Sequence, residues 1–222
     1  MSQEKLRTVS VVEALSKALS EAIFRMEYLP GQQITEGDVV SRFNVSRNTV
    51  REATASLILN GLLVKEANKG IFVKKIQEAD VREIFHFRML LETEAVHFII
   101  RNGRKIPQQL ITSMESIELD PFIQRDWYRF VSSDLTFHAE LVRASNSVRL
   151  MRLYDAIRQE IMLCICQSES TLILNPRNIY EHRQFIEKLE SGTEEEAVAL
   201  VTNHINYGVE NLAKGFQTQA NA

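Results

Sequence analysis

The sequence predicts a mainly α-helical protein with an N-terminal winged helix-turn-helix and a C-terminal all-helical bundle. Apolar residues recur at helical spacing over most of the chain. The 222 residues include only 4 Pro and 8 Gly, which favours long helices and few loops. Near the start, three helical segments precede two short apolar runs, the order of a winged helix-turn-helix. We expect a DNA-binding domain over residues 1–76 and a helical domain over 77–222.

The N-terminal elements follow from local signals. Leu29-Pro30-Gly31 ends the first helix. The third helix begins at Ser46, a good N-cap, and ends near Asn60-Gly61, because glycine is favourable just after a helix C-terminus. Residues 67–70 read as a hairpin turn between two strands. The expected helices and strands are, in order, residues 10–27, 36–43, 46–60, 62–64 and 71–73.

Residues 74–80 are polar and are expected to form a linker to the second domain. Beyond them every segment has helical periodicity, and dipeptides such as Asn102-Gly103 and Asp120-Pro121 separate the helices. The expected helices cover about residues 79–102, 107–118, 122–145, 147–169, 176–190 and 193–216.

The composition excludes several classes of protein. It is 45% hydrophobic and 25% charged, which is ordinary for a globular protein. No run of eighteen apolar residues or apolar signal core is present, so we expect neither a membrane span nor a membrane partner. Cys164 and Cys166 lie two apart in a helical pattern, a poor disulfide or metal pair. They suit a reduced, cytoplasmic protein.

The charge is divided unevenly along the chain. Residues 1–76 carry 11 Lys and Arg against 8 Asp and Glu, a net charge of +3, whereas residues 77–222 carry 15 against 21, a net charge of −6. A mildly basic first domain on an acidic second domain suits a chain that contacts DNA at one end only.

The segment FNVSRNTVREA, residues 43–53, reads as the turn and second helix of a helix-turn-helix. Arg47 and Arg51 are four residues apart and project from one face. That face begins at the helix N-terminus, the end such proteins insert into the major groove, where helix N–H groups also favour a phosphate. An ordinary surface helix with two solvated arginines is the alternative. The DNA-contacting residues expected here are Ser46, Arg47, Asn48, Thr49 and Arg51.

At the tip of the hairpin, Lys69 and Gly70 are expected to approach DNA. Lys69 is placed to reach a backbone phosphate or the minor groove. A solvated turn lysine is an equally good reading of the local sequence.

Three histidines and one aspartate form a candidate metal site in the second half. Asp134 and His138 are four residues apart and point from one helix face. His182 and His204 are equidistant from the turn at residues 191–193, so an antiparallel helix pair brings them level. Three imidazoles and a carboxylate suit a divalent ion such as Zn²⁺, Ni²⁺, Mn²⁺ or Fe²⁺. The alternative is a set of separate histidines with local hydrogen bonds.

Arg88 interrupts an otherwise apolar helical stretch, so it needs an anionic partner. Glu92, four residues later, is the structural candidate for that partner. An anionic small molecule is the functional candidate.

The two halves together resemble the GntR family of bacterial transcription regulators, in its FadR-type branch with the all-helical FCD effector domain. The resemblance covers about residues 10–215. The matching residues of the first half are Leu29-Pro30-Gly31, Ile34, Val45-Ser46-Arg47, Val50-Arg51-Glu52-Ala53, Leu57, Gly61-Leu62, Gly70 and Val73. Those of the second half are Arg88, Glu92, Asp134, His138, His182 and His204.

The resemblance implies a homodimeric repressor that binds a near-palindromic double-stranded DNA operator and responds to a small organic acid. It also implies a divalent ion at the four metal positions, with the acid bound at or near it. Because Arg88 needs an anion, we expect Arg88 to contact this acid. Asn48 and Thr49 stand where the family often has Thr-Pro, Thr54 replaces a usual leucine, and Gly37 stands where some relatives have a DNA-contacting arginine. These departures bear on the operator sequence.

Two other functions fit parts of the sequence. A metal-dependent hydrolase or lyase is one, but it needs a general acid or base near metal-bound water. Glu181 adjoins His182 and is expected to point off to the side of the histidine cluster. The other is a constitutive DNA-binding protein whose helical half only dimerises.

Overall fold

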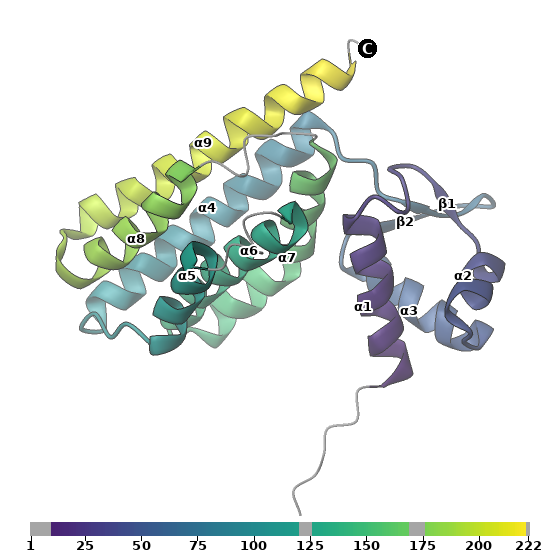
Figure 1. Ribbon diagram of the computed structural model, residues 1–222, viewed down its shortest axis with the longest axis horizontal. Coiled ribbons are helices and arrows are strands. Elements are labelled where there is room, and N and C mark those ends of the chain that lie inside the picture. Colours follow the sequence, from purple (N-terminus) through teal and green to yellow (C-terminus); the bar gives the residue numbers. More distant parts are fainter. Residues whose placement is uncertain (1–9, 120–125, 169–175, 221–222) are drawn as a thin grey trace, which may run out of the picture. The chain divides into compact units, whose positions relative to one another are not determined.

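The chain divides into two structural units, Met1–Lys75 and Ile76–Ala222 (Figure 1). The structure is a computed structural model and describes residues 10–119, 126–168 and 176–220. Within these residues, no helix is both long and apolar enough to cross a membrane.

Three capped helices build the N-terminal unit: α1 (Val11–Phe24), α2 (Glu36–Phe43) and α3 (Arg47–Leu59). The Ser10 hydroxyl accepts a hydrogen bond from the Glu13 N–H, and the Glu13 carboxylate accepts one from the Ser10 N–H. This reciprocal pair satisfies donors that a helix start leaves unpaired. Thr35 caps α2, and Ser46 caps α3 as the sequence predicts.

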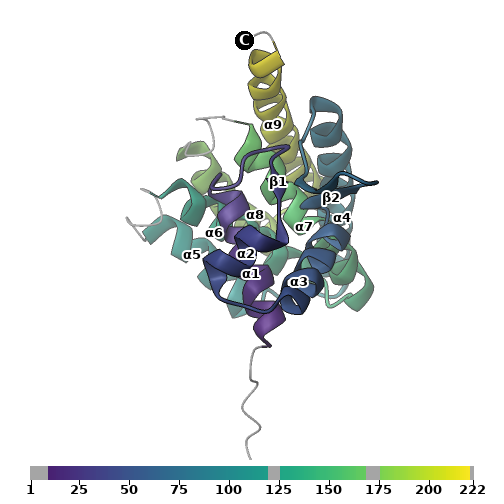
Figure 2. The same cartoon turned by 90° about the vertical axis from the view of Figure 1, so that its right-hand side faces the viewer.

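A three-stranded sheet with the strand order β1-β3-β2 completes this unit, and its strands β1 and β2 are labelled in Figure 2. Strands β2 (Leu63–Glu66) and β3 (Gly70–Val73) form the predicted antiparallel hairpin. Strand β1 (Gln33–Ile34), which is not predicted from the sequence, pairs with β3. Two residues are too few to show the alternation by which a strand is recognised.

Both helical faces that meet in this unit are apolar. Leu19 and Ile23 of α1 and Val50 and Leu57 of α3 are almost fully buried, and α1 packs against α3. Their burial leaves the opposite side of α3 facing the solvent.

The C-terminal unit is a bundle around the long helix α4 (Glu78–Arg101), which packs against α6, α7 and α9. The remaining helices are α5 (Gln108–Leu119), α6 (Trp127–Ala144), α7 (Val148–Gln167), α8 (Pro176–Ser191) and α9 (Glu194–Ala220). The last helix runs four residues beyond the predicted end at 216. The predicted start at residue 122 and end at residue 169 lie outside the described residues.

Candidate metal centre and nucleic-acid interface

Helix α3 presents its predicted DNA-contacting residues to the outside. Ser46, Arg47, Asn48 and Arg51 are exposed, and Thr49 is half-buried. The Ser46 hydroxyl accepts a hydrogen bond from the Thr49 N–H at 3.1 Å. The Asn48 side-chain amide donates to the Glu52 carboxylate at 2.7 Å. The arginine-bearing face is thus solvent-accessible at the start of the helix.

The two arginines of this face differ in their surroundings. Arg51 donates from Nε and Nη2 to the two carboxylate oxygens of Glu36 on α2, at 2.6 and 3.2 Å. The hydrogen bond from Arg51 lowers the pKa of Glu36. No acidic partner is found for Arg47 among the described residues, although its charge also acts on Glu36. Only one of the two arginines is therefore held by a carboxylate.

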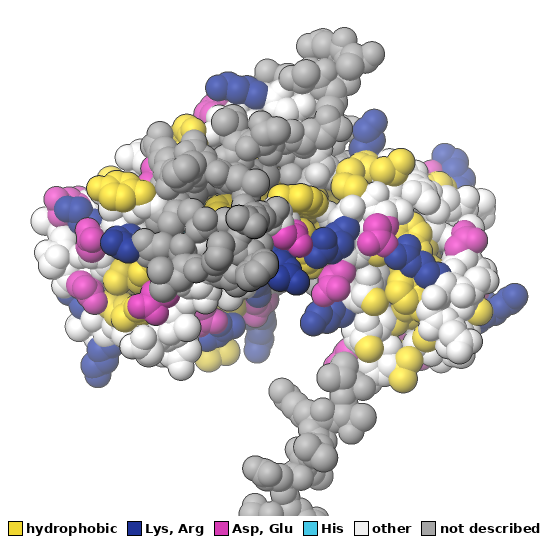
Figure 3. Space-filling model, in the orientation of Figure 1, with side chains coloured by type: hydrophobic (Ala, Val, Ile, Leu, Met, Phe, Trp, Pro, Cys, Tyr) yellow, Lys and Arg dark blue, Asp and Glu magenta, His cyan; other side chains and the backbone are white. Residues whose placement is uncertain are grey.

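The hairpin tip forms part of the wall of a groove of about 900 Å³, whose lining includes Glu36, Arg51, Asn68 and Gly70. Lys69 is exposed, and its Nζ lies 3.0 Å from the Glu66 carboxylate. Gly70 has φ +121°, and a Cβ there would lie 2.6 Å from Gln33 Nε2. Glycine therefore lets the tip approach β1 closely. On the face in Figure 3, basic and acidic side chains are interspersed over this unit.

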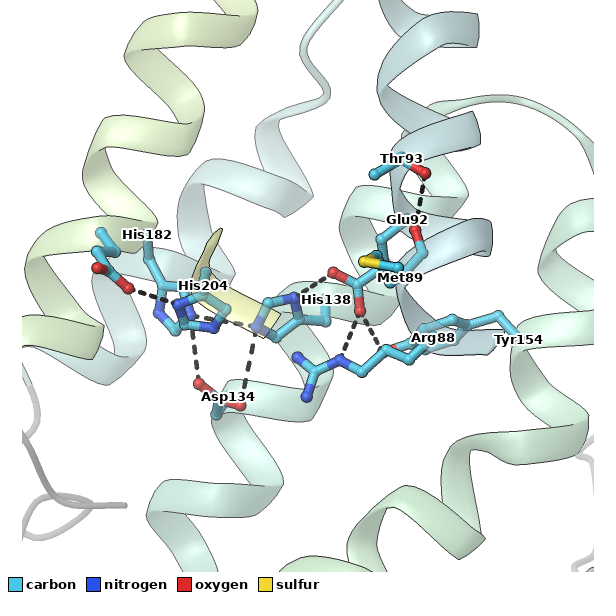
Figure 4. A network of polar contacts seen from close by, with 10 residues as sticks. Arg88, Met89, Glu92, Thr93, Asp134, His138, Tyr154, His182 and His204 are labelled. Atoms are coloured by element: carbon cyan, nitrogen blue, oxygen red, sulfur yellow. Dashed lines mark hydrogen bonds and ion pairs between the residues drawn. The ribbon is translucent and has the colours of Figure 1, made fainter. Parts of the chain in front are cut away.

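In the C-terminal unit, the structure brings all four predicted metal ligands together (Figure 4). Asp134 and His138 come from α6, His182 from α8 and His204 from α9. All four are buried, and one ligand atom from each lies within 4.8 Å of the others. The predicted symmetry about the α8–α9 turn places the His182 and His204 rings 5.2 Å apart.

Two carboxylates behind the cluster fix which ring nitrogens face it. Glu92 Oε2 lies 2.7 Å from His138 Nδ1, and Glu181 Oε2 lies 2.7 Å from His204 Nδ1. If each Nδ1–H donates to its carboxylate, each Nε2 presents a lone pair to the cluster. The Nδ1 of His182 is buried and has no hydrogen-bond partner among the described residues.

The spacing of these atoms suits an ion at their centre. His182 Nε2 lies 3.3 Å from His138 Nε2 and 3.2 Å from Asp134 Oδ1, and His138 Nε2 lies 3.8 Å from Asp134 Oδ2. Tetrahedral ligands about 2.0–2.1 Å from Zn²⁺ are separated from one another by about 3.3–3.4 Å. The residues present therefore fit a divalent ion.

Burial and neighbouring charges set the protonation of the cluster. Burial lowers the pKa of His138, and the positive charge of Arg88 adds to the effect. Burial also lowers the pKa of His204, although the bond to Glu181 opposes it. Burial opposes ionisation of Asp134, but the bond from His182 and the nearby positive charges outweigh it and lower the pKa of Asp134. Neutral imidazoles and an ionised carboxylate are the forms that bind metal.

Of the two anionic partners considered for Arg88, the structure contains Glu92. Arg88 Nε donates to Glu92 Oε1 at 2.8 Å, so Glu92 is its structural partner. Arg88 Nη2 is buried and has no hydrogen-bond partner among the described residues. Tyr154 also donates to Glu92 Oε1, at 3.3 Å. The charge of Glu92 raises the pKa of Arg88 despite its burial.

Three carboxylates make contacts that are not predicted from the sequence. Glu181 was expected to point off to the side of the cluster, but it is buried against His204, because α9 packs beside α8 and presents that ring to it. Glu92, which the sequence predicts only as a partner of Arg88, also contacts His138, and the contact between Glu36 and Arg51 is not predicted at all. Since Glu92 and Glu181 both contact histidine nitrogens, neither is placed as a free general base for the alternative enzyme.

Comparison with known proteins gives matches over both units. Residues 11–73 match the family described as bacterial regulatory proteins, gntR family, and residues 83–207 match the FCD domain. The chain is 27% identical over 175 residues to the probable D-xylose utilization operon transcriptional repressor of Paenarthrobacter nicotinovorans, covering 79% of this chain and 76% of that protein. It is 36% identical over 128 residues to the transcriptional repressor RspR of Escherichia coli, covering 54% and 56%.

Solved structures share the fold. A GntR transcriptional regulator from Rhodococcus sp. RHA1 has a TM-score of 0.78 at 24% identity, covering 92% of this chain and 98% of that one. McbR/YncC of E. coli has a TM-score of 0.77 at 17% identity, covering 94% and 100%.

Proposed function

Because the chain belongs to the GntR family of bacterial regulatory proteins and carries an FCD domain, we propose that it is a metal-containing, effector-controlled repressor. The N-terminal unit binds an operator, and the C-terminal unit binds a small carboxylate at a divalent ion. The observation that carries the proposal is the buried set of Asp134, His138, His182 and His204 in a chain that also exposes a basic helix face. Repression is the function named for two relatives.

The DNA contact is assigned to Ser46, Arg47, Asn48, Thr49 and Arg51 of the α3 segment and to Lys69 and Gly70 of the hairpin. An arginine side chain on such a helix face can contact guanine with two hydrogen bonds or bind a phosphate. An operator selected from random duplexes, titrated by fluorescence anisotropy, tests the assignment. Arg47→Ala or Arg51→Ala should weaken operator binding about 5- to 150-fold. Lys105→Ala, which removes an exposed charge from the other unit, should not. Unchanged affinity in both arginine variants contradicts the assignment.

The bound form is a homodimer on a near-palindromic site, because two-fold related heads read inverted half-sites. Phe87 and Leu90 on α4 and Leu153 on α7 are exposed apolar residues on two helices that pack together. They support a second copy of the chain as the partner. Sedimentation should give two chains per operator, and Leu90→Glu should shift the free protein to monomers. One chain on a full operator contradicts the dimer.

One divalent ion is held by Asp134, His138, His182 and His204. It would link three helices and offer further coordination positions to a ligand oxygen. Elemental analysis of protein purified without a histidine tag tests this. Wild type should contain one equivalent of metal, and His182→Ala should contain much less. Equal metal content in both proteins contradicts the site.

The effector is a small organic acid whose carboxylate ligates the ion and accepts a hydrogen bond from Arg88. The buried, unpartnered Nη2 of Arg88 is the observation that favours an anion. A coupling of about 1–3 kcal/mol would change operator affinity about 5- to 150-fold, and DNA must change acid affinity by the same factor. A thermal-shift screen of organic, sugar and amino acids, followed by DNA titration with each hit, tests it. Hits that bind equally to metal-free protein contradict it.

A further inference from the structure

We propose that Glu36 is a specificity-determining residue. It orients Arg51 to contact a base and prevents Arg51 from binding a backbone phosphate. The inference rests on the proposed DNA binding by α3. Glu36 is the first residue of α2, fifteen positions before Arg51, and lies beside it only because the two helices pack together.

The geometry of the pair selects one edge of the guanidinium. Arginine has five N–H donors in a planar fork. Glu36 accepts from Nε at 2.6 Å and from Nη2 at 3.2 Å, so its carboxylate covers the Nε/Nη2 edge. The opposite edge, formed by Nη1 and the second N–H of Nη2, keeps two parallel donors. Two parallel donors match the O6 and N7 acceptors of guanine in the major groove.

The charge of Glu36 disfavours the competing contact. A phosphate oxygen at the Nε/Nη2 edge would have to displace the Glu36 carboxylate, and a phosphate beside that carboxylate is repelled by it. Arg47 has no such carboxylate among the described residues, so its fork is unrestricted. Arg51 is therefore restricted to a base contact, whereas Arg47 can bind either a base or a phosphate.

Glu36 is held in place by its own helix start. The Thr35 hydroxyl accepts from the Asp38 N–H at 3.1 Å, which caps α2 directly at Glu36. The first turn of α2 is therefore a fixed support for the carboxylate. Asp38 lies in the same turn, is exposed, and contacts Thr35. It provides a matched control, because Asp38→Asn removes the same charge near the same surface.

The test is a binding comparison on the full-length protein. Operators are selected from a random library with wild type, and each position is then substituted to measure base preference. Glu36→Gln and Glu36→Ala should lower the preference at one G·C pair about fivefold or more, since a bidentate guanine contact is lost or relaxed. The same variants should bind random duplex more tightly, with a steeper salt dependence, because Arg51 becomes free to bind phosphate. Asp38→Asn should leave every base preference unchanged.

A lower base preference together with a higher affinity for random duplex would show that Glu36 positions Arg51. A variant that damages the fold of the domain would instead lose both base preference and affinity for random duplex. In an Arg51→Ala background, Glu36→Ala should have no further effect at that base pair. Unchanged preferences in both Glu36 variants, or an equal loss of operator and random binding, would overturn the role of Glu36 while leaving the proposed regulator intact. If wild type selects no sequence from the library, the proposed DNA binding fails, and this inference fails with it.

Discussion

Two arginine–glutamate pairs of similar local geometry lie in opposite environments in this chain. In each, arginine Nε donates to glutamate Oε1, at 2.6 Å for Arg51–Glu36 and 2.8 Å for Arg88–Glu92. The side chains of the first pair are 65% and 38% exposed, and those of the second 4% and 0%. The N-terminal unit thus places its pair in water, and the C-terminal unit encloses its pair in a helical core.

The comparison shows that burial, more than the contact itself, determines how much an arginine–glutamate pair contributes to stability. Water competes for both members of an exposed pair, so the pair contributes little to stability, and the uncovered edge of its arginine stays accessible to a ligand. A buried pair has lost its hydration, so removal of either member leaves an uncompensated charge. Arg88–Glu92 is therefore a fixed frame, on which His138 and Tyr154 are also held.

The largest expected effect comes from breaking the buried pair. Glu92→Ala should lower the free energy of unfolding of the metal-free C-terminal unit by about 3–5 kcal/mol, because Arg88 is left buried without its partner. Urea unfolding followed by circular dichroism measures this. The double variant Arg88→Met/Glu92→Leu should cost much less than the sum of the single losses. A loss below about 1 kcal/mol in Glu92→Ala would remove the contrast between the two pairs.

The second-largest effect is expected at Glu181, a buried carboxylate whose partner is a histidine instead of an arginine. Glu181→Gln should weaken metal binding about 10- to 100-fold, since the carboxylate that orients His204 becomes a neutral amide. Competition with a chromophoric chelator measures the affinity. Glu187→Gln changes an exposed carboxylate on the same helix and should bind metal as wild type does. Equal affinities in all three proteins would mean that His204 needs no support from Glu181.

A smaller effect is expected from pH on metal-free protein. Burial lowers the folded-state pKa of His138 and His204, whereas the unfolded value is about 6.5. Below about pH 6.5 the unfolded chain binds more protons, so stability falls as pH drops, by up to about 1.4 kcal/mol per pH unit for each histidine. Urea midpoints between pH 5 and 8 test this, with the exposed His86→Gln as control. Flat midpoints in wild type would contradict neutral buried histidines.

The smallest effect belongs to the exposed pair. Glu36→Ala should leave the thermal midpoint unchanged at both low and high salt, because its carboxylate and its arginine are already in water. Differential scanning calorimetry of wild type and variant provides the comparison. A midpoint lowered by more than about 2 °C would show that the pair supports the fold.

Most features that the sequence predicts correctly follow from the spacing of residues along the chain. The recognition helix follows from the cap at Ser46 and the four-residue interval between Arg47 and Arg51. The convergence of His182 and His204 follows from their equal distance from one turn. Glu36 escaped prediction because its partner Arg51 lies on a neighbouring helix, and helical periodicity does not report contacts between helices. Glu181 and His204 are almost equally distant from the turn at residues 191–193, so the same turn argument could have placed Glu181 beside that ring.

The four candidate ligands also have a topological consequence. Asp134 and His204 are separated by about 70 residues along the chain and are brought together only in the folded state. An ion bound there would act as a reversible cross-link that closes this loop, and its binding free energy would add to folding. The lifetime of the unit against proteolysis would then follow the free metal concentration in the cell. The amount of regulator, as well as its DNA affinity, would depend on metal supply.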